Sequence, residues 1–177
     1  PHRQDCGMRD GEDRLIQIRA LQKHDREAIR RILLATGVFT SEEVDVALEL
    51  VDAALGDPGQ RDYELRVGVT ASNEVAGFYC VGPTPLTAGT YDLYWIAVDP
   101  ALHDRGIGAQ LLNHAEALVK AQRGRLIVAE TSSQPKYEHT RNFYVKNAYT
   151  EVARIREYYR LGDDLVVYGK FLSQSGV

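Results

Sequence analysis

A glycine-containing loop between an apolar run and an amphipathic pattern is the part of the sequence best suited to chemistry. Residues 91–98 are rich in aromatic and β-branched residues, which indicates a buried strand, and Pro100 ends it. Gly106-Ile107-Gly108 follows, and apolar residues then recur at helical spacing. The first amides of a helix have no internal partner, the helix dipole adds positive potential, and glycines let a phosphate approach the backbone. The segment therefore predicts a site for an anion.

The spacing of the loop narrows the kind of anion site. A dinucleotide-binding loop carries three glycines as G-x-G-x-x-G, and here the third position is Leu111. Such a site also needs an acid about 20 residues further on, and Glu130 lies at roughly that distance. A Walker loop needs Gly-Lys-Ser/Thr, which is absent. A nucleotide-binding domain is thus disfavoured but stays an alternative.

The segment resembles the acetyl-CoA loop of the GNAT superfamily of N-acyltransferases. That family's pattern is Gln or Arg, two residues, Gly, any residue, then Gly or Ala, after a strand that ends in Val-x-Pro. Val98-Asp99-Pro100 and Gly106-Ile107-Gly108 fit this pattern, whereas His103 at the Gln/Arg position departs from it. The resemblance implies that the pyrophosphate is held by backbone amides of one run: His103, Asp104, Arg105, Gly106, Ile107, Gly108 and Ala109. It also implies that pantetheine pairs with the backbone near Ile96 and Val98.

Length and composition bound the remaining possibilities. The 177 residues predict one domain at 14–173, after a loose polar tail at 1–13. A net charge of −4 without a Lys/Arg block gives no support for nucleic-acid binding, and no apolar run is long enough to span a membrane. The lack of an apolar leader and the unpaired spacing of Cys6 and Cys80 favour the cytoplasm. The histidines show no ligand spacing, which predicts no metal.

The order of predicted elements extends the resemblance over residues 15–172. Asp25 is the predicted cap of the first helix, and Thr40 or Ser41 caps the second. The predicted strands are 15–19, 63–70, 75–81, 91–98, 126–131, 152–160 and 165–172, and the predicted helices are 25–36, 41–55, one from near 108, and 137–147. Periodicity alone supports a layered mixed α/β domain. The resemblance implies more: a mixed, mostly antiparallel central sheet, flanked by helices, with splayed fourth and fifth strands.

Acyl transfer from a thioester to an amine needs few protein groups: a base for the amine, donors for the oxyanion and a proton for the thiolate. Asp92 lies six residues before Val98, where some GNAT enzymes carry a glutamate base. Glu130, near the end of the adjacent strand, is the second candidate base. Tyr144 resembles the family's tyrosine that protonates the CoA thiolate. Each also has a structural interpretation: an acid that caps a turn or pairs with an arginine, and a core aromatic.

The motif around Tyr144 carries one departure. In the family the tyrosine on the last helix is followed by Gly-Phe, and here Ala148-Tyr149 stand in that place. The resemblance nevertheless implies an N-acetyltransferase that moves an acetyl group from acetyl-CoA to a primary amine of a small molecule. Asp92 or Glu130 would be the base and Tyr144 the acid in a direct attack. The alternatives are a peptide or protein amine as acceptor, or a non-catalytic acyl-CoA-binding regulatory module, and a homodimer is a possible assembly.

Overall fold

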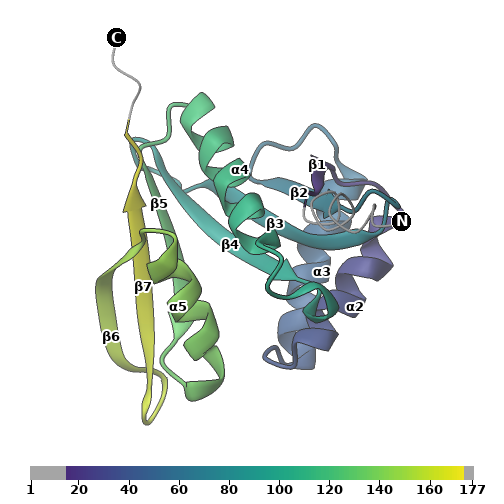
Figure 1. Ribbon diagram of the computed structural model, residues 1–177. Coiled ribbons are helices and arrows are strands. Elements are labelled where there is room, and N and C mark those ends of the chain that lie inside the picture. Colours follow the sequence, from purple (N-terminus) through teal and green to yellow (C-terminus); the bar gives the residue numbers. More distant parts are fainter. Residues whose placement is uncertain (1–14, 174–177) are drawn as a thin grey trace, which may run out of the picture. The chain divides into compact units, whose positions relative to one another are not determined.

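The computed structural model describes residues 15–173 as a seven-stranded mixed sheet with helices packed on it (Figure 1). The strands are β1 (Gln17–Ala20), β2 (Glu64–Val69), β3 (Val75–Pro83), β4 (Thr90–Val98), β5 (Leu126–Ser132), β6 (Thr150–Arg160) and β7 (Asp163–Phe171). The helices are α2 (Asp25–Thr36), α3 (Ser41–Gly56), α4 (Ile107–Ala121) and α5 (Glu138–Lys146), with short turns η1 (Pro100–Leu102) and η2 (Pro135–Tyr137). The predicted tail, residues 1–13, lies outside the described residues.

The strand order is β1-β2-β3-β4-β5-β7-β6. β4 and β5 run parallel and pair from Thr90 with Leu126 to Asp92 with Val128, whereas β1–β2, β5–β7 and β6–β7 are antiparallel. A parallel pair needs a crossover, and α4 supplies it. The predicted mixed, mostly antiparallel sheet with helices against it is therefore confirmed.

The chain forms two compact units. Unit 1 comprises residues 15–60, Leu65–Tyr79 and Trp95–His114, and unit 2 comprises Arg61–Glu64, Cys80–Tyr94 and residues 115–173. The single domain predicted for residues 14–173 stays a prediction. So does the splay of the fourth and fifth strands, because β5 and the last part of β4 belong to different units.

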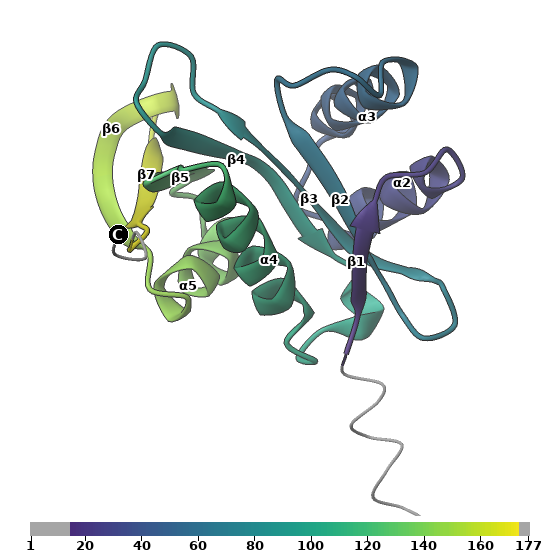
Figure 2. The ribbon, with the colours of Figure 1, turned by 90° about the horizontal axis from the view of Figure 1, so that it is seen from above.

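In unit 1, helices cover both faces of the sheet. Figure 2 shows α2 and α3 side by side on one face of its strands, with the first half of α4 on the other. The inward faces of α2 and α3 carry fully or nearly fully buried side chains: Ile29, Ile32, Leu33, Val44, Ala47, Leu48 and Val51. Thr40 caps α3 as predicted, because its hydroxyl accepts from the Glu43 amide at 3.2 Å while the Glu43 carboxylate accepts from the Thr40 amide at 2.7 Å.

The predicted cap of α2 is wrong. His24 occupies the cap position, and Asp25 is the first helical residue, with its side chain fully buried. Both carboxylate oxygens of Asp25 accept from the guanidinium of Arg19, at 2.7 and 2.9 Å, and one also accepts from the Gln22 amide. An acid at a helix start can cap the helix or form an ion pair, and here Asp25 forms an ion pair with Arg19 on β1.

The link between α2 and α3 is packed against β4. The ring of Phe39 meets the ring of Trp95 edge to face, with centroids 5.2 Å apart. Trp95 is half-buried and is the only tryptophan of the chain. Edge-to-face aromatic pairs contribute about 0.5–1.5 kcal/mol beyond area burial, so this contact helps to fix the link.

The closing hairpin of unit 2 is longer than the sequence predicts. β6 begins at Thr150 rather than at residue 152, and β7 begins at Asp163 rather than at residue 165. The early start of β7 follows from a tight turn at Leu161-Gly162, in which Gly162 takes the left-handed conformation with φ +75°. The early start of β6 comes from the pairing of Thr150 with Gly169 at the other end of the hairpin. In residues 15–173, none of the helices combines the length and the apolar composition that a bilayer crossing requires.

Candidate active site

The predicted anion loop of unit 1 is anchored at its start by Asp99. One carboxylate oxygen of Asp99 accepts from the Ala101 amide at 3.0 Å and so caps η1. The other accepts from the guanidinium of Arg31 on α2 at 2.8 Å. The Asp99 amide donates to the Ala76 carbonyl of β3 at 2.8 Å. Both ends of this residue are therefore fixed, and its negative charge is neutralised by Arg31 rather than left beside the loop.

The loop itself is exposed and leads into the start of α4. Asp104 and Gly106 take the left-handed conformation, with φ +63° and +74°, and residues 103–106 are all exposed. The Gln110 amide donates to the Gly106 carbonyl at 3.1 Å, which makes Gly106 the residue before the first turn. Glycine has no side chain to accept from the first amides of α4, and the first turn holds no acid. The first amides of a helix have no partner within the helix, so this helix start can offer them, with positive dipole potential, to an external anion.

The inward stripe of α4 holds this helix start in place. α4 begins at Ile107, and the side chains of Ile107, Leu111 and Leu112 are at most 2% exposed in unit 1. His114 accepts or donates at Nδ1 to the Tyr79 hydroxyl of β3 at 2.8 Å. Burial, and then the charge of Arg66, lower the pKa of His114. The apolar residues that recur at helical spacing are thus buried, and the lowered pKa favours the neutral imidazole in the contact of His114 with Tyr79.

The predicted pantetheine positions lie on the last part of β4. Ile96 and Val98 are half-buried. β3 approaches this stretch closely at Gly77, where an added Cβ would lie 2.6 Å from the Ala97 carbonyl oxygen. No described contact tests whether Ile96 and Val98 pair with a ligand, so both stay predictions.

The strand register of unit 2 divides its sheet into two faces. Tyr91 pairs with Ile127, and Ile127 pairs with Lys170, so these three side chains point to one side. That side faces α4, because the Tyr91 hydroxyl donates to Gln122 at 3.1 Å and the Lys170 ammonium donates to Glu116 at 2.9 Å. Neighbouring residues along a strand point to the other side. We call this other side the carboxylate face, since it carries Asp92 and Glu130.

Asp92 is a half-buried carboxylate with one fixed oxygen. The hydroxyl of Thr84, in the loop between β3 and β4, donates to Oδ2 of Asp92 at 2.6 Å. Tyr94 follows on the same face, and burial, and then the charge of Asp92, raise the pKa of the Tyr94 hydroxyl. Thr84 was not foreseen from the sequence, because only the hairpin loop brings it back to Asp92.

Glu130 lies on the same face as Asp92. Asp92 pairs with Val128, and Glu130 is two residues further along β5, opposite Val167 of β7. Glu130 is exposed, whereas Asp92 is half-buried. The structure thus brings both candidate bases to one face of unit 2, and it gives Asp92 the more enclosed position.

Tyr144 lies on the helix side of the same sheet. Its ring stacks on Tyr168 with centroids 5.6 Å apart and planes at 26°, and Tyr168 pairs with Ala129, which shares the face of Ile127. The Tyr144 side chain is buried, and burial raises the pKa of its hydroxyl. Tyr144 therefore keeps its proton near neutral pH, on the opposite side of the sheet from Asp92 and Glu130.

The end of α5 explains the motif that follows Tyr144. Ala148 takes the left-handed conformation with φ +66° and donates its amide to the Val145 carbonyl at 3.1 Å. Tyr149 donates its amide to the Tyr144 carbonyl at 3.0 Å. This pair of bonds is a Schellman motif, in which glycine is the usual left-handed residue. Alanine at this position costs backbone strain, which accounts for glycine being the usual residue there.

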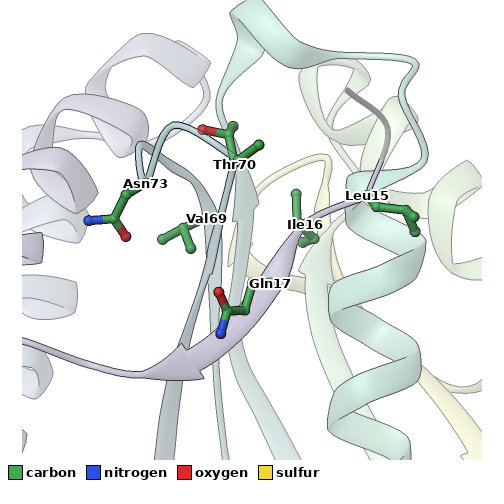
Figure 3. A pocket seen from close by; sticks show the side chains of 7 residues that line it. Leu15, Ile16, Gln17, Val69, Thr70 and Asn73 are labelled. Carbon is green, nitrogen blue, oxygen red and sulfur yellow. The ribbon is translucent and has the colours of Figure 1, made fainter. Parts of the chain in front are cut away.

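Other groups in the described part of the chain give little sign of chemistry. In residues 15–173 no group of three or more His, Cys, Asp or Glu side chains could hold a metal ion. Burial raises the pKa of the Cys80 thiol to about 12, so its thiolate is scarce near neutral pH. A pocket of about 320 Å³ in unit 1 lies between the start of β1 and the end of β2 (Figure 3). It is lined by Leu15, Ile16, Gln17, Val69, Thr70, Ala71 and Asn73, none of which titrates.

Known proteins resemble this chain in sequence and in fold. Residues 64–151 match the family model described as an acetyltransferase (GNAT) domain, and no curated protein sequence matches the chain. A crystal structure from Desulfovibrio desulfuricans, assigned to the GNAT family of acetyltransferases, is 40% identical, covers 90% of this chain and 100% of its own, and superposes with a TM-score of 0.85.

Two more distant structures share the fold. The ribosomal-protein-S18-alanine N-acetyltransferase of Escherichia coli is 20% identical, with a TM-score of 0.70 over 92% of this chain and 97% of its own. An aminoglycoside 6'-N-acetyltransferase complexed with coenzyme A is 18% identical, with a TM-score of 0.72 over 91% of this chain and 99% of its own.

Proposed function

The chain belongs to the GNAT family of acetyltransferases, and we propose that it transfers an acetyl group from acetyl-CoA to a primary amine of a small molecule. The observation that carries the proposal is the start of α4. A Val98-x-Pro100 strand end is followed by an exposed loop and by Gly106, directly before the first turn of α4. A pyrophosphate carries the charge and the acceptor oxygens that such a helix start binds.

The amides of residues 104–109 hold the pyrophosphate in this proposal. The His103 amide, which the resemblance also assigned to it, donates to the Pro100 carbonyl at 3.3 Å. Gly106 supplies open space, because an added Cβ would meet no atom within 4 Å. His103 stands where the family has Gln or Arg, and backbone amides need no particular side chain there. Arg105, exposed in the same loop, adds a positive charge. Pantetheine pairs with the β4 backbone at Ile96 and Val98.

Asp92 is the general base that we favour. An attacking amine must lose a proton, and a positioned carboxylate can take it directly or through one water. Thr84 binds Oδ2 of Asp92, which fixes the carboxylate and leaves Oδ1 for the amine or the water. Thr84 is thus a positioning residue in this proposal. Glu130 is the alternative base, and its greater exposure makes its orientation less fixed.

Tyr144 protonates the departing CoA thiolate in this proposal. Its aromatic neighbours Phe143, Tyr149 and Tyr168 restrict the ring. Because its pKa is raised by burial, Tyr144 is a weaker acid than a free phenol. A thiolate is a good leaving group with a pKa of about 8.5, so a weak donor near the sulfur suffices.

Release of free thiol from acetyl-CoA tests the proposal. The full chain is incubated with acetyl-CoA and a panel of primary amines, and we expect thiol release that depends on an amine. A thermal-shift series with CoA, ATP and NAD distinguishes a CoA-dependent transferase from the alternative, a nucleotide-binding domain. A ligand that binds the native state raises the apparent stability of the protein. Stabilisation by ATP or NAD but not by CoA would contradict the proposal. CoA binding without turnover on any amine would favour the regulatory module instead.

A further inference from the structure

The carboxylate face of unit 2 carries an unbalanced charge. Its positions with an assigned register are Thr90, Asp92, Leu126, Val128, Glu130, Ser132, Thr150, Ala153, Ile155, Arg160, Asp163, Leu165, Val167, Gly169 and Phe171. Arg160 and Asp163 form an ion pair with each other at 3.8 Å, which leaves Asp92 and Glu130 as an excess of two negative charges. The opposite side differs, because its acids Glu116 and Glu151 are paired with Lys170 and Arg154. The carboxylate face thus complements a cation.

The two carboxylates are close enough to act on one group. Asp92 pairs with Val128, and Glu130 lies two residues beyond Val128 on β5. Ordinary strand spacing and rise put their Cα atoms about 8 Å apart. Side chains of this length can then approach one ammonium from two sides. The further acid on the face, Asp163, already accepts hydrogen bonds from Ser132 and Gln134.

The remainder of the face is apolar and partly uncovered. Val128 lies beside both acids, and Val167 is directly opposite Glu130. Further out, Ile155 is 51% exposed opposite Leu165, and Phe171 is 69% exposed at the other end of β7, opposite Leu126. Of the two, Ile155 continues the apolar surface of Val128 and Val167, and an exposed apolar surface of this kind suits a binding face.

We propose that the acceptor is a monoamine on an apolar body. This inference rests on the proposed function. The ammonium group lies between Asp92 and Glu130, and the hydrocarbon part lies along Val128, Val167 and Ile155. An amino acid is a poor acceptor, because its carboxylate meets two acids, and the cation on the face, Arg160, is paired with Asp163. A polyamine or aminoglycoside is also poor, because its additional ammonium groups would lie on valine and isoleucine without partners.

Two matched pairs of acceptors test this inference. Phenethylamine and phenylalanine differ by one carboxylate, and hexylamine and 1,6-diaminohexane differ by one terminal amine. We expect kcat/KM to be at least about tenfold higher for phenethylamine and for hexylamine than for their partners, since an unpaired charge weakens transition-state binding. A preference for phenylalanine or for the diamine would overturn the inference and leave the proposed function intact. Turnover of none of the four, with turnover of another amine of the panel, would overturn the inference alone, whereas no turnover on any amine of the panel would overturn both.

A variant on the face gives a second readout. Ile155→Asp adds a carboxylate at an exposed position and is expected to raise kcat/KM for 1,6-diaminohexane relative to hexylamine by about threefold or more. The matched control is Val145→Asp on α5, which is 59% exposed and lies off the carboxylate face. An equal change in both variants, or none in Ile155→Asp, would overturn the placement of the hydrocarbon part.

Discussion

The backbone N–H of Tyr149 donates to the carbonyl oxygen of Tyr144 at 3.0 Å, and the two rings pack with centroids 5.6 Å apart. In a Schellman motif the residue after the left-handed position often contacts the residue five before it, and here both members of that contact are tyrosines. The turn that ends α5 therefore also fixes the ring of the proposed proton donor. Ala148 is the strained member of this turn.

Replacing Ala148 with glycine is expected to stabilise the protein. Removing the Cβ from the left-handed position stabilises the folded state by about 1–2 kcal/mol. The greater backbone entropy of glycine stabilises the unfolded state by about 0.5–1 kcal/mol. These ranges give a net gain of up to about 1.5 kcal/mol, which urea unfolding measures. Ala53→Gly is the control, at an exposed helical position of α3, and is expected to lose about 1 kcal/mol. A loss of stability in both variants would contradict the strain at Ala148.

Removing the hydroxyl of Tyr144 is expected to slow turnover without weakening CoA binding. General acids contribute about 100-fold to 10,000-fold, and a thiolate leaving group places Tyr144→Phe at or below the low end. The reduction in kcat should be constant between pH 6 and 9, because burial raises the pKa of Tyr144 above this window. Steady-state kinetics across pH and calorimetry with CoA measure the two effects. Full turnover at every pH would leave Tyr144 as a packing residue.

Substitutions at Asp92 and Thr84 are expected to lower the rate on the same side of the pH–rate profile, the acidic side. Asp92→Asn should lower the rate most on the acidic side of the optimum, where the amine is protonated and needs a base. Thr84→Val removes only the hydroxyl that holds Oδ2 and should give a smaller loss with the same dependence on Asp92. In the Asp92→Asn background, Thr84→Val should therefore have little further effect. Additive losses would show that Thr84 acts independently, and a profile of unchanged shape in Asp92→Asn would direct attention to Glu130.

Gly106 and Gly162 form a matched pair for testing the anion loop. Both take the left-handed conformation, with φ +74° and +75°, and neither has an atom within 4 Å of an added Cβ. Valine at either position costs similar backbone strain, so the two variants should lose similar stability. Only Gly106→Val is expected to weaken CoA binding, by at least about tenfold in calorimetry, because its side chain occupies the approach of the phosphate. Equal CoA affinity in both folded variants would place the pyrophosphate elsewhere.

Asp25 is expected to contribute stability that disappears in acid. Burial alone would raise its pKa, but hydrogen bonds from Arg19 and the Gln22 amide outweigh burial and lower the pKa of Asp25. A lowered folded pKa gives stability that is present above the unfolded value of about 3.9 and is lost as pH falls through the folded value. Asp25→Asn should cost about 3 kcal/mol at pH 7, and the difference from the wild type should shrink below pH 4. Asp52→Asn, in an exposed pair with Arg26, is the control and should show little effect.

Local patterns made much of the fold predictable from the sequence. The capping box of Thr40 and Glu43, the stripe of α4 and the strand ending at Val98 are encoded within a few residues. The role of Asp25 was predicted wrongly because an acid at a helix start can serve either as a cap or as an ion-pair partner. Only the folded structure shows that Arg19 lies close enough to form the ion pair.

The carboxylate face could not be predicted from the sequence. It depends on the register of β5 against β4 and β7, and a slip of one residue would move Glu130 to the other side. The contact of Thr84 with Asp92 likewise depends on the conformation of the hairpin loop. Both relationships join segments whose spacing along the chain carries no local signal.

Trp95, whose ring packs against Phe39, and the tyrosines give the protein two separate optical probes. The single tryptophan belongs to unit 1, whereas nine of the ten tyrosines belong to unit 2 and only Tyr79 to unit 1. Fluorescence excited selectively at tryptophan therefore follows unit 1, and tyrosine absorbance follows mainly unit 2. Coincident urea transitions by the two signals indicate one cooperative unit, and separate midpoints indicate that one unit unfolds while the other remains folded.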